Sequence, residues 1–469
     1  MKSYKYHPYR LTRRDFMTIM GLTTAGVFFR STGMATPLKL LSGPQRGSYL
    51  ATVAATQHSD YDIALLKQKI AYLFNLLGGI DDVIGPGDKV GIKINLTGGA
   101  YWANHANLNG VDIREAAWTH PAVLQAVGEL LIDHGVAPSD IYIVEALWDQ
   151  QCYNNFGYLA VQQYLGAQLV NLNEPAPYAG FANISTGDDP FFYSSFILNQ
   201  VLGEIDAFVS IPKMKQHYDA GVTHSMKNLV GIVPLQYYQL PGITGWRSAI
   251  HQEGGPVGYH LPRSVCDINM ARPVNLAVID GIKNAEGGEG PWNPTFVPSV
   301  YDLLIAGKDP VATDSIASLA MGNDPEPEQL SLPAGGECDN HLWLAHQKGM
   351  GTNLLSEIEL LGDGAGIILG VDDNGEIASA QNGIRLYPNY PNPFKSYTNI
   401  KFALKEDAVI QLSILDQAGR IVAVLKQGYM EKGEHLARFN ASGYPAGIYY
   451  CRLVADGNGV TIKLIKIKN

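Results

Sequence analysis

The sequence predicts an α/β domain with a mostly parallel sheet flanked by helices, followed by a C-terminal all-β, immunoglobulin-like sandwich. Through the middle of the chain, short apolar runs alternate with segments whose apolar residues recur every three or four positions, as strands and amphipathic helices do. From about residue 384 the pattern changes to short runs of period two, separated by turn residues. The 469 residues, 46% of them hydrophobic, suffice to bury more than one core.

The α/β domain is expected to span residues 45–370. Its strands are expected at 49–54, 88–96, 141–145, 168–172, 207–212, 274–280 and 302–306. Four helices are expected: one from Ile63 to the Gly78-Gly79 pair, one opened by Pro121 and capped by Thr119 or His120, and two over 310–321 and 340–348. Asp309 is the expected cap of the third helix. Strands that alternate with helices in this way favour a parallel sheet.

The C-terminal sandwich is expected over residues 384–469, after a linker at 371–383 that is rich in Gly, Asp and Asn. Its strands are expected at 399–404, 409–415, 420–425, 434–440, 447–454 and 460–468. The segments YPNYPNPF (387–394), DQAGR (416–420) and AGIYY (446–450), with a last strand in which lysines alternate, resemble the type A C-terminal sorting domain of the type IX secretion system. This resemblance implies export by that machinery. An unrelated sandwich that binds carbohydrate or a partner is the alternative.

The first 35 residues have the features of a signal peptide. Adjacent Arg13 and Arg14 precede Asp-Phe and a short apolar run at 19–29, and small residues follow at 33–35. The arginine pair resembles a twin-arginine (Tat) signal, which would make the Tat translocase a partner. Because the apolar run is too short to span a bilayer, no stable transmembrane anchor is expected, and the protein is expected in the periplasm, at the cell surface or secreted. A basic amphipathic helix is the alternative interpretation of this segment.

Charge and cysteine content argue against nucleic-acid binding and against an iron-sulfur cofactor. The net charge of -10 opposes binding to nucleic acid. The four cysteines are far apart and have no metal-ligand spacing, so no ferredoxin-type iron-sulfur cluster is expected. Buried free thiols are favoured over two disulfides, because Cys451 alternates with apolar residues as a core strand residue does.

Polar residues gather where the predicted strands end. Ligands of open α/β sheets bind beyond the carboxyl ends of strands, so these residues are expected to line one crevice. The loop 211–217 and the segment 221–228 concentrate three lysines and two histidines in an acidic protein. Lysines held together favour a bound carboxylate or phosphate, although a solvated basic loop is an equal alternative. The predicted catalytic residues are His217, as the acid/base, with Lys213 and Lys215, which also hold the anion; Lys93, Asn95 and Lys227 are predicted to bind the anion.

A divalent metal is the expected cofactor of the same crevice. Asp280 and Glu286, with Glu289, lie in a glycine-rich stretch that could bring carboxylates together on Mg²⁺ or Ca²⁺. A turn whose acidic side chains face water is the alternative. The stretch lacks the GxGxxG pattern of a dinucleotide site.

The motifs of the α/β segment together resemble the domain-of-unknown-function 362 family. They are VGIKIN (90–95), THPA (119–122), IPKMKQH (211–217), SMKNLVG (225–231), VIDG (278–281) and AGKDPVATD (306–314). The family is associated with iron-sulfur proteins, but this chain lacks the cysteines, and no reaction follows from the resemblance. Two functions are therefore expected: a metal-assisted enzyme acting on a small anionic substrate, or a non-catalytic ligand- or cofactor-binding accessory protein of the cell envelope.

The change of pattern near residue 384 predicts two cores that fold independently. We expect removal of residues 384–469 to leave a folded α/β domain, because the glycine-rich segment before it suits a linker. Thermal unfolding of the truncated protein should remain cooperative. Loss of that cooperative transition would contradict the prediction.

Overall fold

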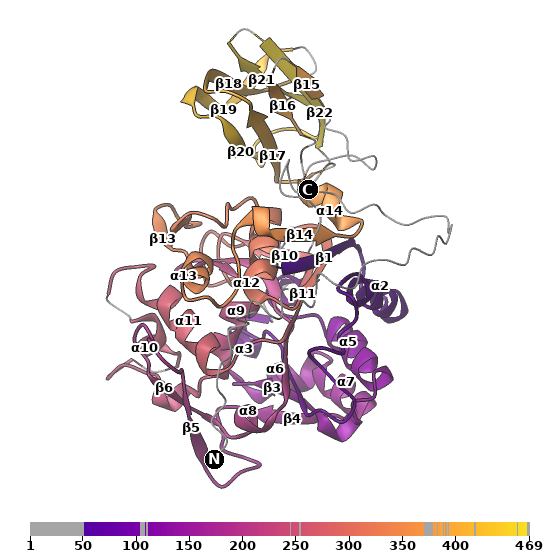
Figure 1. Cartoon of the computed structure of the whole chain (residues 1–469), viewed down its shortest axis with the longest axis vertical. Coiled ribbons are helices and arrows are strands. Elements are labelled where there is room, and N and C mark those ends of the chain that lie inside the picture. Colours follow the sequence, from indigo (N-terminus) through magenta and orange to yellow (C-terminus); the bar gives the residue numbers. More distant parts are fainter. Residues whose placement is uncertain are drawn as a thin grey trace, which may run out of the picture.

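The computed structural model describes residues 51–469 apart from 104–107, 109–110, 244, 253–254, 370–378, 382, 388, 390–391, 393, 417–418, 457 and 467–469. Two units follow each other along the long axis of the molecule, with the C-terminal strands, coloured yellow, at one end (Figure 1). The expected signal peptide, including Arg13 and Arg14, and most of the expected linker lie outside the described residues. The predicted fold class, a mostly parallel α/β unit followed by an all-β unit, is confirmed.

In the described part of the chain, ten strands form one mixed sheet in the first unit. Its order is β14-β1-β11-β10-β7-β2-β3-β4, with β8 paired to β10 and β9 paired to β8. The run from β10 to β4 is parallel, whereas β11 is antiparallel to both of its neighbours. The strands of this sheet are β1 Ala51–Gln57, β2 Val90–Lys93, β3 Ile141–Glu145, β4 Gln168–Asn171, β7 Ala207–Ser210, β8 Lys213–His217, β9 Gly221–Thr223, β10 Leu276–Glu286, β11 Val297–Gly307 and β14 Ile358–Leu361.

Helices join these strands, and two short hairpins lie outside the sheet. The helices are α2 Ile63–Leu76, α3 Gly99–Ala103, α4 Ile113–Ala117, α5 Pro121–Asp133, α6 Gln150–Asn155, α7 Tyr158–Leu165, α8 Val201–Glu204, α9 Ser225–Asn228, α10 Ser248–His251, α11 His260–Ala271, α12 Pro310–Ala320, α13 His341–Gln347 and α14 Gly364–Leu369. Single 3-10 turns occupy Pro138–Asp140, Leu229–Ile232, Leu235–Tyr237 and Leu355–Glu357. The hairpins are β5 Phe181–Ser185 with β6 Ser195–Asn199, and β12 Gln329–Ser331 with β13 Glu337–Asp339.

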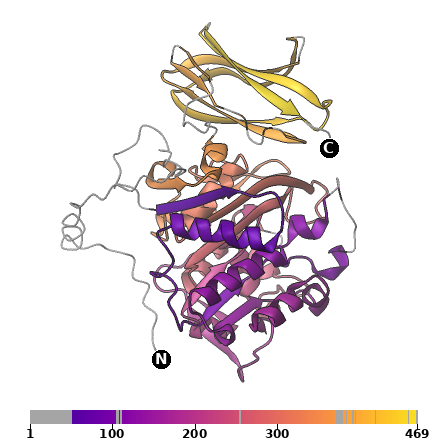
Figure 2. The same ribbon diagram turned by 90° about the vertical axis from the view of Figure 1, so that its right-hand side faces the viewer.

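Helices cover both faces of the sheet, with α2, coloured indigo, on the face turned to the viewer in Figure 2. Two consecutive residues of β7 point to opposite faces of the sheet. Val209 packs in the core that contains α2 and α5, and Phe208 packs in the core that contains α11. Strands buried on both faces need apolar residues at every position, which explains the continuous apolar runs in the sequence.

Helix capping follows the local sequence. The imidazole of His120 accepts a hydrogen bond from the Ala122 amide at 3.1 Å and so caps α5, which decides between the two expected caps. Asp309 caps α12 as predicted, accepting from the Ala312 amide at 2.9 Å.

Residues 211–217, expected as a loop, contain a strand. Lys213 and Lys215 of β8 are in register with Asp280 and Ala285 of β10. Strands β7 and β8 pair one after the other with the long strand β10, so the polar side chains of β8 lie in the protein interior. A run of polar residues does not by itself predict a buried strand. Lys213, Lys215 and His217 are all buried, so the solvated-loop alternative is wrong.

Asp314 of α12 holds the segment that follows β9. Its carboxylate accepts hydrogen bonds from the backbone amides of Ser225 and Met226 at 2.8 and 2.9 Å and from the Ser225 hydroxyl. Burial raises the pKa of Asp314 to about 7, and the hydrogen bonds from Ser225 and Met226 oppose that rise. The short helix α9, which carries Lys227, is thereby fixed to the core.

The C-terminal unit consists of two four-stranded antiparallel sheets in the described residues, ordered β15-β16-β17-β20 and β19-β18-β21-β22. A single core between them contains Phe402, Leu412 and Cys451. The strands are β15 Ser379–Gln381, β16 Ile384–Leu386, β17 Tyr397–Leu404, β18 Ala408–Leu415, β19 Ile421–Met430, β20 Gly433–Asn440, β21 Gly447–Ala455 and β22 Asn458–Lys466.

The two units meet through a small set of side chains. The ring of Tyr397 on β17 lies 5.7 Å from the ring of Tyr301 on β11, and the Arg438 guanidinium lies 3.7 Å from the Tyr397 ring centroid. Arg438 also forms an ion pair with Glu286 at the end of β10. Aromatic and ionic contacts therefore connect the sandwich to the strand that borders the candidate site.

Two further expectations can be compared with the structure. All four cysteines are buried free thiols, as favoured from the sequence. Among the described helices, none has the length and apolar character needed to cross a membrane.

Candidate functional site

A cavity of about 450 Å³ lies where β2, β3 and β8 end, and we call it the strand-end cavity. Its wall includes Lys93 and Glu145, the last residues of β2 and β3, together with Lys215 and His217 of β8. Other lining residues are Asn95, Leu96, Thr97, Gly98, Trp148, Asp219, Thr223, Lys227, Asn228, Val230, Gly231, Gly245, Trp246, Arg247, His251, Glu289 and Trp292. The position beyond the carboxyl ends of parallel strands agrees with the usual ligand position in open α/β sheets.

A buried ion pair forms the end of the cavity nearest to β2 and β3. Lys93 Nζ lies 2.7 Å from Glu145 Oε2 and also donates to the Ile94 carbonyl at 2.6 Å. Burial lowers the pKa of Lys93 and raises that of Glu145, while their mutual attraction opposes both shifts. Asn228 adds to the pair, because its Oδ1 lies 3.3 Å from Lys93 Nζ and 3.0 Å from Asn95 Nδ2. Lys93 and Asn95 are thus bonded within the protein.

Lys227 differs from the other cations of the cavity. Its side chain is buried, yet its Nζ forms no hydrogen bond or ion pair with any described residue. Burial lowers the pKa of Lys227 to about 8, although Glu289 and Asp219 raise it. A buried ammonium without a partner is costly in free energy, so this position favours a compensating anion.

Lys215 contributes a second cation. Its Nζ donates to the Ala117 and Glu289 carbonyl oxygens at 2.7 and 3.2 Å. Burial, and next the positive charge of Lys227, lower the pKa of Lys215 well below its ordinary value. The two lysines therefore disfavour each other's charge unless an anion lies near them.

The orientation of His217 is fixed on both sides of its ring. Nδ1 accepts a hydrogen bond from the Asp219 amide at 3.0 Å, so in the neutral ring Nε2 carries the proton, 3.7 Å from Glu289 Oε2. Burial lowers the pKa of His217 well below 6.5, which keeps the ring neutral at pH 7. Burial alone would raise the pKa of Glu289, but His217, Lys227 and a hydrogen bond from Trp292 outweigh it and the pKa is lowered.

His251 is a residue that sequence reasoning missed. Its Nδ1 lies 3.0 Å from the Arg247 carbonyl oxygen and must donate to it, which leaves the Nε2 lone pair available. Burial lowers its pKa to about 4, so the ring is neutral at pH 7. The rings of His251 and His217 are 6.2 Å apart, and both line the cavity.

Sequence reasoning also missed the aromatic residues of the cavity and Arg247. Trp148, Trp246 and Arg247 come from segments without a recognisable motif. A signal was available in the short spacing from Trp246 to His251, which puts an aromatic, a cationic and a titratable side chain within six residues. Arg247 itself donates to the Val233 and Ala146 carbonyls at 2.6 and 3.3 Å, so it supports the wall.

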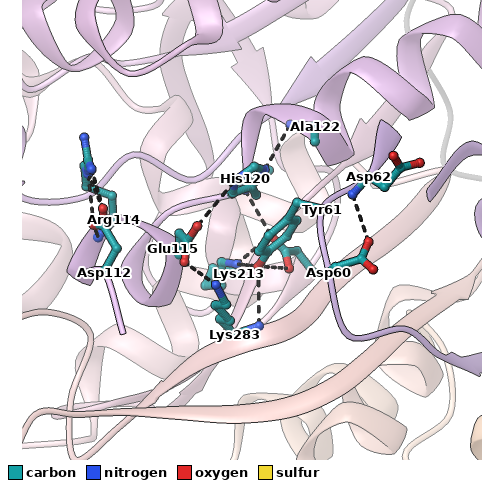
Figure 3. A network of polar contacts seen from close by, with 12 residues as sticks. Asp60, Tyr61, Asp62, Asp112, Arg114, Glu115, His120, Ala122, Lys213 and Lys283 are labelled. Atoms are coloured by element: carbon teal, nitrogen blue, oxygen red, sulfur yellow. Dashed lines mark hydrogen bonds and ion pairs between the residues drawn. The ribbon is translucent and has the colours of Figure 1, made fainter. Parts of the chain in front are cut away.

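Lys213 and Asp280, expected in the same crevice, do not line the strand-end cavity. They form a fully buried ion pair with Nζ and Oδ2 2.5 Å apart, and Tyr61 donates to Asp280 Oδ1 at 3.2 Å. The Tyr61 ring stacks on His120 with centroids 3.6 Å apart, and Lys213 and Lys283 lie beside it (Figure 3). The residues expected in one crevice therefore lie in two places, because the register of β8 on β10 puts Lys213 beside Asp280 and outside the strand-end cavity.

Glu286, the second expected metal ligand, also has other partners. Its carboxylate pairs with Arg438 of the sandwich and accepts a hydrogen bond from the Tyr301 hydroxyl at 3.3 Å. Among the described residues, no group of three or more His, Cys, Asp or Glu side chains is arranged to hold a metal ion. The metal expected from the sequence stays a prediction.

Comparison with known proteins agrees with the two-unit architecture. Residues 90–318 match the family described as Domain of unknown function (DUF362), and residues 389–468 match the Secretion system C-terminal sorting domain. The α/β unit therefore contains the segment that matches the DUF362 model, and the sandwich contains the segment that matches the sorting domain. The sorting domain marks the protein as exported, with a location at the cell surface or outside the cell.

Individual relatives are distant. A thylakoid-associated protein of Synechocystis sp. is 26% identical over 281 residues, which are 58% of this chain and 75% of that protein. Among solved structures, dimeric latent PorU of Porphyromonas gingivalis is 13% identical, with a TM-score of 0.16 over 20% of this chain and 10% of that chain. PorZ, a surface component of the type IX secretion system of the same organism, is 19% identical, with a TM-score of 0.13 over 18% and 11%. The matches span only about a tenth of either structure, and they carry no inference about the site.

Gly231 provides a test of the ion pair that supports the cavity. A Cβ at this position would lie 2.6 Å from both Lys93 Nζ and Glu145 Oε1. We expect Gly231→Ala to displace the buried pair and lower the free energy of unfolding by about 3 kcal/mol, as measured by chemical denaturation. Gly180→Ala, where a Cβ meets no atom within 4 Å, is the matched control and should change stability by less than about 0.5 kcal/mol. Equal stability of the two variants would show that the pair tolerates displacement.

Proposed function

We propose that this exported protein binds a small organic anion in the strand-end cavity, through Lys227 and Lys215. The observation that carries the proposal is Lys227, a largely buried side chain that lines the cavity and whose ammonium has no hydrogen-bonding or ionic partner among the described residues. An anion would supply both the missing charge and the missing hydrogen-bond acceptors.

The charge balance of the cavity supports this proposal. Its lining holds four basic side chains, Lys93, Lys215, Lys227 and Arg247, against three acidic ones, Glu145, Asp219 and Glu289. Lys93 is paired with Glu145, and Arg247 is bonded to carbonyl oxygens. The basic side chains of the lining thus exceed the acidic ones by one, and burial lowers the pKa values of both Lys215 and Lys227.

Acid–base catalysis on the bound anion is the second candidate function. His251 lines the cavity and has an unprotonated Nε2 in its neutral ring, and Glu289 faces the Nε2 of the second imidazole, His217. A neutral imidazole with a free lone pair is the arrangement that a general base requires. His251 is better suited to this role than His217, because both nitrogens of His217 already have partners.

Metal assistance is left out of the proposal, because Asp280 and Glu286 each have a cationic partner and neither lines the cavity. For the first step of export we propose the Tat route, on the basis of the adjacent Arg13 and Arg14 ahead of a short apolar run.

Sulfate binding tests the role of Lys227. Sulfate keeps its charge across neutral and alkaline pH, so a change of affinity reports on the protein. We expect Lys227→Met to weaken sulfate binding at pH 7 at least about tenfold, because a charge-assisted hydrogen bond is lost. In the unmodified protein the affinity should fall as pH rises through about 8, where Lys227 loses its proton, and the fall should be smaller in the variant. Isothermal titration calorimetry on the full chain measures both effects.

Lys426→Met, at an exposed position of β19, is the matched control and should bind sulfate as the unmodified protein does. Removal of a buried unpaired charge should not lower stability, so Lys227→Met is expected to fold. Equal sulfate affinity of both variants would overturn the proposed function.

A further inference from the structure

We infer that the ligand of the strand-end cavity carries a flat aromatic ring beside its acidic group, as an aromatic carboxylate or an aryl phosphate does. This inference rests on the proposed anion-binding function and adds the chemical class of the ligand. The observation behind it is the concentration of tryptophan around the buried cations.

Three of the six tryptophans of the chain line this cavity, and they come from three separate segments. Trp148 follows β3, Trp246 precedes α10, and Trp292 follows the glycine-rich stretch after β10. Trp118, in contrast, is buried against Phe156 and donates to the Thr97 carbonyl, as a core tryptophan does. Segments far apart in sequence thus contribute the same rare side chain to one cavity.

The ring of Trp292 is held in place. Its Nε1 donates to Glu289 Oε1 at 2.8 Å. A Cβ on Gly98 or Gly290 would lie 2.1 or 2.2 Å from this indole, so the ring packs directly on glycine backbone that no other residue could supply. Trp292 is therefore a rigid wall of the cavity, and its indole position depends on the same Glu289 that faces His217.

Trp148 and Trp246 leave aromatic surface for a ligand. Trp148 is 40% exposed, and no described aromatic ring or cation packs on its indole. The rings of Trp246 and His251 form a T-shaped pair with centroids 5.0 Å apart. Aromatic side chains beside a polar site provide faces for offset stacking or edge-to-face contact with a ligand ring.

The size of the cavity agrees with a ring-containing ligand. A volume of about 450 Å³ is within the range of cavities that enclose drug-sized molecules, and an inorganic anion would leave most of it unfilled. Lys227 and Lys215 would bind the acidic group, while the tryptophans would contact the ring. An aliphatic acid could bind the lysines but would lack a ring to stack on the tryptophans.

Three sulfonates with the same charged group test this inference. Benzenesulfonate carries a flat ring, cyclohexanesulfonate a non-aromatic ring of similar size, and methanesulfonate no ring. Calorimetry on the full chain should show benzenesulfonate binding about tenfold more tightly than methanesulfonate and at least about threefold more tightly than cyclohexanesulfonate. Trp148→Leu should weaken benzenesulfonate binding about fivefold and leave sulfate binding unchanged. Trp246→Leu is a second variant with the same expected result.

Tyr164→Leu, which removes an exposed aromatic residue of α7 away from the cavity, is the matched control and should bind all probes normally. If sulfate binds but benzenesulfonate binds no more tightly than cyclohexanesulfonate, the aromatic inference fails and the anion-binding function stands. Benzenesulfonate affinity that is unchanged in both tryptophan variants would also overturn the inference. If no probe binds, or if Lys227→Met binds every probe normally, the proposed function itself fails.

Discussion

The burial of Lys227 is the constraint on which this interpretation of the site depends. A largely buried lysine whose ammonium has no direct partner lowers stability, so other interactions must hold it in place. Asp314 supplies them by accepting two backbone hydrogen bonds and one hydroxyl hydrogen bond from the first residues of α9. Asn228, the next residue after Lys227, is bonded to Lys93 of β2 and Ser210 of β7. The position of the lysine is thereby set by the sheet and by α12.

The long strand β10 connects the three charged regions of the molecule. Asp280 in its middle pairs with Lys213, Glu286 at its end pairs with Arg438 of the sorting domain, and Glu289 just beyond it faces the strand-end cavity. Acidic residues close together in sequence therefore have three different basic partners. A carboxylate that is already paired with a cation is a poorer metal ligand, and Asp280 and Glu286 are both paired in this way.

Much of the fold could be predicted from the sequence, because hydrophobic periodicity reports directly on burial. The run VGIKIN and the pattern of α5 identify elements whose burial is simple. The strand β8 could not be predicted, because KMKQH is polar at four of five positions and its burial depends on partners distant in sequence. The sequence predicts that four residues lie near one another, because they lie at or after strand ends: Lys93, Lys215, His217 and Lys227. It does not predict that Lys213 lies outside their cavity, because that depends on the register of Lys213 with Asp280. His251 and the tryptophans enter the cavity from loops, whose path no local pattern determines.

Anion binding by Lys227 is tested most directly by locating a bound anion in crystals of the full chain grown with selenate, an oxyanion whose position anomalous scattering reveals. If Lys227 binds an anion, an anomalous peak is expected inside the strand-end cavity within hydrogen-bonding distance of Lys227 Nζ, and no such peak is expected in crystals of Lys227→Met. Selenate bound only at exposed surface positions, with the cavity free of anomalous density in the unmodified protein, would contradict this expectation.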